Sequence, residues 1–149
     1  MTGGVLAPTL PEALTTAARA LHDFADPVAM RRRVAVLSLR RWTAGGFEPV
    51  PPATAPRALS DADRLRGDPQ APVLWAPDPD SCTLCAANGH ETRTRLAPDE
   101  VRRLTRALSG PDPVAVGALL NAVAPGARRD VGRALLERLE SFRAFHRTP

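Results

Sequence analysis

The sequence predicts a mainly α-helical, bundle-like protein with a proline-rich linker and one small cysteine-containing β-hairpin. Three observations favour this class. Apolar residues recur at helical spacing near both ends of the chain. Eight of the sixteen prolines fall within residues 47–80. Two cysteines lie in a turn between two short strand-like segments.

Three parts are expected from this pattern. Residues 1–46 form a helical pair, residues 47–71 form the linker, and residues 72–149 hold the hairpin and three helices. A chain of 149 residues supports one domain or two very small ones. A single compact domain that includes all three parts is therefore the alternative.

Capping patterns place the first two helices. Thr9 and Glu12 have the spacing of a capping box, and Pro11 suits the first turn. The apolar stripe that follows is Leu10, Leu14, Ala18, Leu21 and Ala25. A second helix is expected to start at Asp26-Pro27, run to about Trp42 and stop at Gly45-Gly46.

Proline blocks both helix propagation and sheet pairing, so residues 47–80 are predicted to be an extended, polyproline-like segment. One short helical turn is expected at residues 60–66. This segment is either a spacer or a docking segment for a partner with an aromatic groove. Strands are expected at residues 72–75 and 90–96, with the cysteine turn between them.

The C-terminal third is predicted to hold three helices joined by short turns. The first opens at Pro98 and ends at Gly110-Pro111. The second opens at Asp112-Pro113 and ends at Pro125-Gly126, and the third covers about residues 128–145. Short joints between consecutive helices are typical of a helical bundle.

Every basic residue is arginine, which fits a GC-rich coding sequence because lysine, isoleucine and tyrosine are all absent. The net charge of +4 is unevenly spread. Residues 1–44 carry +3, residues 45–80 carry −3, and residues 81–149 carry +4. The acidic middle either pairs with the basic ends of the same chain or contributes to an electric field that steers a charged partner toward the protein.

Several classes are not supported by the sequence. It has no apolar run of membrane-spanning length, no secretory signal in residues 1–10, and no Walker or dinucleotide-binding pattern. Two cysteines cannot make a disulfide-rich scaffold. The histidines His22, His90 and His146 stand in no hydrolase motif. We therefore expect a cytoplasmic protein without catalytic residues or a membrane partner.

The sharpest local motif is Cys82, Cys85 and His90, with Gly89 before the histidine. Two cysteines at this spacing can hold a tetrahedral zinc ion from one turn. The spacing resembles the first three ligands of a CCHC zinc knuckle, with Arg95 in the place of the fourth. The resemblance implies a zinc-stabilised hairpin that binds single-stranded nucleic acid.

Other readings of the motif remain open. The fourth ligand could come from Asp78, Asp80, His22 or His146, from water, or from a second chain. The cysteines could instead be two reduced, partly buried thiols. Dithiol redox chemistry is a further alternative, although the acidic residues before Cys82 would raise a thiol pKa.

Arginine clusters are the candidate nucleic-acid contacts, because guanidinium groups bind phosphate in a two-pronged geometry. The residues expected to make these contacts are Arg31, Arg32, Arg33, Arg40, Arg41, Arg128, Arg129 and Arg133. Trp42 could stack on a base. A third patch consists of Arg102, Arg103 and Arg106. The alternative is that acidic side chains of the same chain pair with these arginines.

Together these features predict a small non-catalytic accessory or regulatory protein with a zinc-stabilised hairpin and arginine-rich, nucleic-acid-contacting faces. The alternative is a protein-interaction or assembly component that binds no nucleic acid, acting through a protein partner or as a homo-oligomer. A dithiol redox protein is the third hypothesis.

Overall fold

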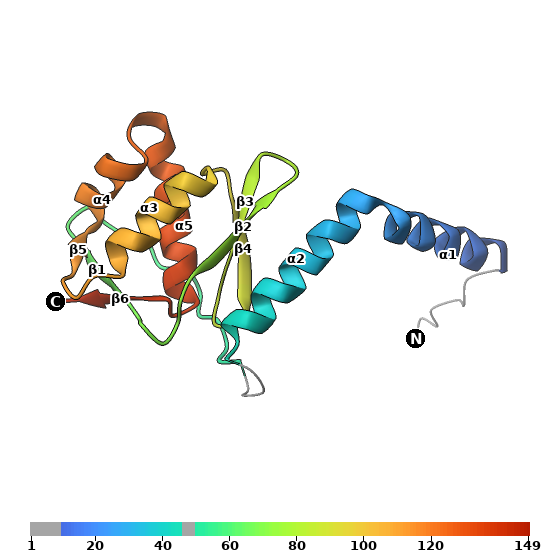
Figure 1. Ribbon diagram of the computed structural model, residues 1–149, viewed down its shortest axis with the longest axis horizontal. Helices are drawn as coiled ribbons and strands as arrows, with labels where there is room; N and C mark the ends of the chain where they lie inside the picture. Colours follow the sequence, from blue (N-terminus) through green and yellow to red (C-terminus); the bar gives the residue numbers. More distant parts are fainter. Residues whose placement is uncertain (1–9, 46–49) are drawn as a thin grey trace, which may run out of the picture. The chain divides into compact units, whose positions relative to one another are not determined.

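The computed structural model describes residues 10–45 and 50–149. The chain divides into two compact units, one ending at Val34 and the other running from Ala35 to Pro149 (Figure 1). The division falls inside helix α2 (Pro27–Thr43). Each unit is therefore described by itself.

The first unit holds α1 (Leu10–Ala25) and the beginning of α2. The predicted start at Asp26-Pro27 is confirmed, because the Asp26 carboxylate accepts hydrogen bonds from the Val28 and Ala29 N–H groups at 3.0 and 3.3 Å. The predicted cap Thr9 lies outside the described residues. Leu10, Leu14 and Leu21 form the predicted stripe and are 62–73% exposed.

The second unit contains a three-stranded antiparallel sheet in the order β2-β3-β4. Its strands are β2 (Leu74–Asp78), β3 (Cys82–Ala87) and β4 (His90–Thr94). Leu84 and Ala86 pack with Leu39 of α2 on one face. The central strand β3 is covered on both faces, which explains its unbroken run of small and apolar residues.

The turn between β3 and β4 is Asn88-Gly89, and both residues have positive φ values, of 48° and 77°. An Asn-Gly pair with positive φ at both positions makes the tight hairpin turn whose twist matches that of the strands. The prediction that the cysteines form the turn of a single hairpin is therefore wrong. They belong to the central strand of two consecutive hairpins.

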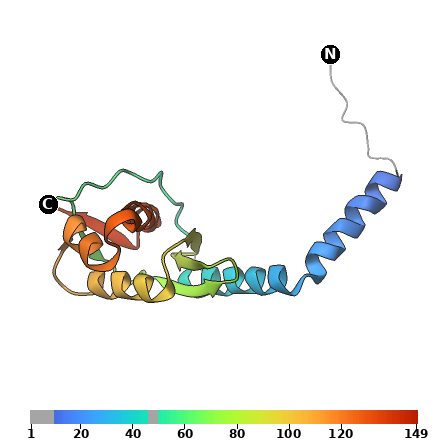
Figure 2. The ribbon, with the colours of Figure 1, turned by 90° about the horizontal axis from the view of Figure 1, so that it is seen from above.

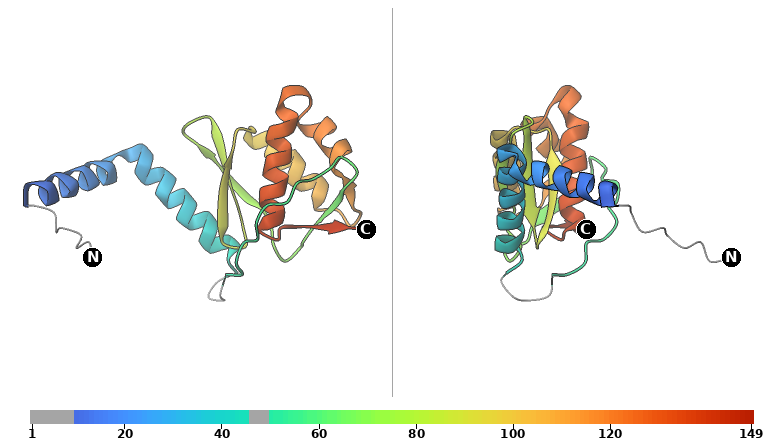
Figure 3. Two further views of the ribbon diagram at one scale, coloured as in Figure 1. Left: turned by 180° about the vertical axis from the view of Figure 1, so that it is seen from behind. Right: turned by 90° about the vertical axis from the view of Figure 1, so that its right-hand side faces the viewer.

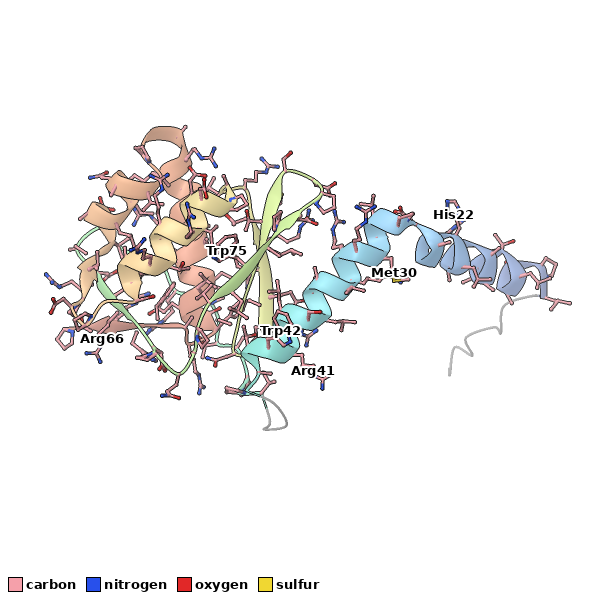
Figure 4. The ribbon with its side chains drawn as sticks, in the orientation of Figure 1. His22, Met30, Arg41, Trp42, Arg66 and Trp75 are labelled. Atoms are coloured by element: carbon pink, nitrogen blue, oxygen red, sulfur yellow. The ribbon has the colours of Figure 1, made fainter. Side chains whose placement is uncertain are left out.

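Two helices contact the other face of this sheet, α3 (Pro98–Leu108) at β2 and α5 (Arg129–Ser141) at β4. The helix α4 (Val116–Val123) packs against both of them, and the 3₁₀ turn η1 (Gly126–Arg128) lies before α5. Glu100 caps α3 by accepting a hydrogen bond from the Ala97 N–H at 2.7 Å. Trp75 of β2 packs against the main core (Figure 4). The fully buried leucines of that core are Leu65, Leu96, Leu104, Leu108, Leu120, Leu136 and Leu139.

A second antiparallel sheet has the order β5-β1-β6. It joins β1 (Arg64–Gly67), β5 (Val114–Ala115) and β6 (Phe145–Thr148). The proline-rich region that contains β1 is thus part of the fold. Leu59 and Leu65 are buried in the main core. Residues 50–60 run on the opposite side of α5 from α3 (Figure 2), and they cross the face of α5 in the view from behind (Figure 3).

The predicted mainly α-helical, bundle-like class is wrong, because the protein is mixed α/β with two three-stranded antiparallel sheets. The last helix ends at Ser141, short of the predicted residue 145, because Arg143 with φ 64° turns the chain into β6. The short helical turn predicted at residues 60–66 gives way to β1 from Arg64 onwards.

Candidate functional site

The sheet separates the two cysteines. Side chains of successive strand residues point to opposite faces, so Cys82 and Cys85 lie on opposite faces of β3. Cys85 faces the main core, together with Ala87. Among residues 10–45 and 50–149, no three His, Cys, Asp or Glu side chains are grouped so as to hold a metal ion. Zinc binding by Cys82, Cys85 and His90 remains a prediction that the strand geometry does not support.

Neither His90 nor Cys85 has the environment of a reactive group. His90 stacks on Phe142 with 5.2 Å between ring centroids, and its Nε2 lies 2.7 Å from the Pro51 carbonyl oxygen. Burial raises the pKa of the Cys85 thiol to about 12, so this cysteine carries no thiolate at neutral pH. Both cysteines are free thiols. The environment of Cys85 gives no support to the dithiol redox hypothesis.

Three of the predicted nucleic-acid contacts gather at the start of α5, where acidic side chains pair with them. Arg129 and Arg133 each contact the Asp61 carboxylate at 2.5 Å. Arg128 contacts Glu100 at 2.6 Å. The hydrogen bond from Arg133 is the largest cause of a lowered pKa for Asp61, followed among the lowering contacts by Arg129. Asp61, in the acidic middle of the sequence, is thus an intramolecular partner of Arg129 and Arg133.

The other predicted contacts lie on α2. Arg31, Arg32 and Arg33 belong to the first unit. In the second unit, Arg40 donates a hydrogen bond to the Gly89 carbonyl at 3.1 Å and lies 3.3 Å from Glu91. Arg41 and Trp42 occupy the last turn of α2 (Figure 4), where Trp42 is 72% exposed. Within the second unit the predicted contacts are thus divided between the end of α2 and the start of α5.

The strand β4 is an edge strand, because it pairs with β3 on one side only. In a tight hairpin the residues that flank the turn exchange hydrogen bonds, and every second pair after them does the same. His90, Thr92 and Thr94 therefore direct their backbone N–H and C=O groups toward β3. Glu91 and Arg93 direct theirs away from the sheet, toward the open edge.

A groove of about 610 Å³ lies between this edge and α5. Its lining residues are Pro56, Thr92, Arg93, Thr94, Arg95, Asp130, Val131, Ala134, Leu135, Glu137 and Arg138. Leu135 is buried and Val131 is half-buried, so the α5 side offers an apolar surface. Three arginines and two carboxylates stand around it, which leaves a mild positive excess.

Arg93 fixes the outer face of β4 through ion pairs of its own. Its Nη2 atom lies 2.5 Å from the Asp78 carboxylate, whose side chain has no exposed surface, and 3.2 Å from Asp80. The side chain of Arg93 thus contacts the end of β2, while its backbone faces the open edge. This separation allows the two parts of one residue to be tested independently.

The alternation of residues 90–96 predicts a strand, and β4 confirms it over residues 90–94. The sequence does not reveal the groove. Sequence alternation shows which side chains share a face, but it does not show whether a strand has one neighbour or two. The role of α5 as a wall of the groove also depends on packing between distant segments.

No protein-family model matches this chain, and no curated protein is significantly similar to it. No helix in the described parts of the chain is both long and apolar enough to cross a lipid bilayer.

Proposed function

We propose that this protein is a non-catalytic accessory module that binds an extended segment of a partner protein along β4. The open edge of β4 beside the apolar side of α5 carries the proposal. An added strand satisfies unpaired backbone N–H and C=O groups, and this pairing supplies affinity in β-strand addition.

The groove also specifies the chemistry of the segment. Side chains of an added strand alternate between the two faces of the sheet, so every second one would enter the groove. Val131 and Leu135 favour apolar side chains at those positions. Arg95 and Arg138 favour an acidic side chain at the rim. The occupant is therefore an extended segment with apolar residues at alternate positions and at least one carboxylate.

A cytoplasmic location fits this proposal. Both cysteines are free thiols on opposite faces of one strand, which suits a reducing compartment.

The test uses the full chain and twelve-residue peptides selected against it from a random display library. We expect selected peptides to shift the amide NMR signals of β4 and of α5. Arg93→Pro removes the outward N–H group, while Arg93→Ala removes the same side chain and keeps that group. Binding should fall up to about tenfold in Arg93→Pro relative to Arg93→Ala, since the edge hydrogen bond that this N–H donates is lost.

Ala134→Trp is the second variant, because Ala134 is exposed and lines the groove without belonging to the core. It should block binding while leaving the thermal unfolding midpoint close to that of the wild type. The proposal is wrong if no peptide is selected, if selected peptides bind elsewhere, or if both variants bind as well as wild type. A dimer that Arg93→Pro dissociates would identify a second copy of the chain as the occupant instead.

A second candidate function is nucleic-acid binding, favoured by the pair α4 and α5 joined through Gly126. Two helices joined by a short glycine-containing turn are the connectivity of a helix-turn-helix, whose second helix begins with base-contacting residues. Asp61 pairs with Arg129 and Arg133 at that position. Binding of a labelled duplex that weakens steeply with salt and strengthens in Asp61→Asn would favour this function over peptide binding.

A further inference from the structure

We propose that the second unit carries a separate site for a small anion attached to an apolar body. The site is a groove of about 910 Å³ between residues 67–73 and the C-terminal half of α3. Pockets of this size suit small-molecule ligands. It shares no lining residue with the β4 groove, and this inference does not depend on the proposed function.

A tightly held loop forms one wall. A Cβ atom on Gly67 would lie 2.6 Å from the Leu108 carbonyl oxygen, so the end of β1 abuts the end of α3. The Asp68 N–H donates to the Ala144 carbonyl at 2.9 Å, and the Asp68 carboxylate accepts a hydrogen bond from the Gln70 N–H at 2.8 Å. These bonds hold the wall in place.

Positive charge dominates the rim. Arg66 reaches the groove from β1 (Figure 4), and Arg102 and Arg106 lie one turn apart on α3. Arg102 also pairs with Asp99 at 3.0 Å. Within residues 10–45 and 50–149, neither Arg66 nor Arg106 forms a salt bridge, although Arg66 is close enough to Asp68 to contribute to the lowered pKa of that carboxyl. Two guanidinium groups from different elements are therefore available to one anion.

Asp68 is the single acidic residue in the lining, and its own contacts occupy it. The Gln70 backbone N–H, and after it the His146 side chain, hold the pKa of Asp68 below its ordinary value. His146 Nε2 lies 3.2 Å from this carboxylate. Asp68 thus stabilises the loop and faces the charge of Arg66, while the guanidinium groups of Arg66 and Arg106 keep N–H donors for the ligand.

The floor of the groove is apolar. Ala71, Ala144 and Phe145 are 1–3% exposed, and Val73 packs against the main core beside them. The hydroxyl groups of Thr105 and Ser109 donate to backbone carbonyls of their own helix, so the guanidinium groups are the side-chain donors left for a ligand. Guanidinium binds carboxylate or phosphate in a two-pronged geometry, and the floor would bind the rest of the ligand.

The experiment titrates the full chain with 1-naphthyl phosphate, 1-naphthoate, 1-naphthol and inorganic phosphate, followed by amide NMR shifts and calorimetry. We expect one or both naphthyl anions to bind and to shift residues 66–73 and 102–109. The affinities of 1-naphthyl phosphate and 1-naphthoate then show whether the site prefers a phosphate or a carboxylate. The neutral naphthol and the inorganic phosphate should each bind at least about tenfold more weakly. Naphthol lacks the anionic group that the arginines bind, and inorganic phosphate lacks the apolar ring that the floor binds.

Arg66→Gln and Arg106→Gln should each weaken binding about tenfold or more, since each removes a charge-assisted hydrogen bond. Arg103→Gln is the matched control, because Arg103 is exposed on the same helix and does not line the groove. Equal weakening in all three variants would mean that overall charge attracts the anion, and it would overturn the proposal. Shifts outside the groove, binding of naphthol as tight as that of the anions, or no binding would do the same.

Discussion

The thiol of Cys85 is a poor nucleophile because the side chain lies on the inner face of β3. The side chain is fully buried, and burial raises the pKa of the thiol to about 12. Cys82 lies three residues earlier, on the opposite face and partly exposed. Two chemically identical residues therefore differ in their access to solvent because of where the strand places them.

We expect this difference to appear in alkylation. Iodoacetamide at neutral pH should modify Cys82 and leave Cys85 unmodified until denaturant is added. Peptide mass spectrometry checks the sites, and Cys82→Ser should then take up no label in the folded state. Rapid labelling of both thiols in the native protein would show that Cys85 is not held in the core. One zinc per chain in native mass spectrometry, lost in Cys82→Ser, would support the zinc prediction.

The hairpin of β3 and β4 is the element on which the candidate site depends. Its turn at Gly89 docks on the end of α2, where the Gly89 N–H donates to Thr43 Oγ1 at 3.0 Å. Asn-Gly is a strong hairpin signal in the sequence itself. A zinc knuckle uses a glycine at this position for its metal turn, so the same residue fits two structures and spacing alone does not reveal the central strand β3.

Gly89→Ala should destabilise the protein by about 1–3 kcal/mol, because an alanine there adopts φ +77° and its Cβ would lie 2.8 Å from Val50 Cγ2. Gly126→Ala is the control, since Gly126 has a similar φ of +65° and nothing within 4 Å of the added Cβ. That variant should lose about 1 kcal/mol. Urea unfolding measures both, and equal losses would show that the contact with Val50 is not a constraint.

At the scale of the whole molecule, ion pairs hold the proline-rich segment on α5 and β6. Glu140, with a side chain 8% exposed, contacts Arg147 at 2.7 Å and Arg57 at 3.2 Å. The hydrogen bond that Arg147 donates to Glu140 is the largest cause of a raised pKa for Arg147. The Leu59 N–H donates to Glu137 at 2.9 Å. Arg57 and the Leu59 N–H thus hold the segment on α5, and Asp63 holds it on β6 through Arg147 at 3.5 Å.

Glu140→Gln should lower the free energy of unfolding by about 1.5–3 kcal/mol, because hydrogen bonds to a buried charged group are lost. Asp99→Asn, which breaks an exposed pair with Arg102, should cost less than about 1 kcal/mol. Denaturant unfolding of the two variants measures the contrast. If Glu140→Gln unfolds like Asp99→Asn, the segment is held by its buried leucines and not by this carboxylate.

The sequence by itself determined the features that depend on a few neighbouring residues. The start of α2 at Asp26-Pro27, the opening of α3 at Pro98 and the alternation that became β4 all follow from local capping and periodicity.

Only the tertiary structure decided the rest. The strand β1 exists because its backbone pairs with that of β6, where Arg66 lies opposite His146, 80 positions away. The prolines of the same segment predict an extended linker. The open edge of β4, the separation of the two cysteines and the pairing of Asp61 with α5 depend equally on distant neighbours. Strand pairing and burial are contacts between remote segments, so composition and spacing within one segment do not determine them.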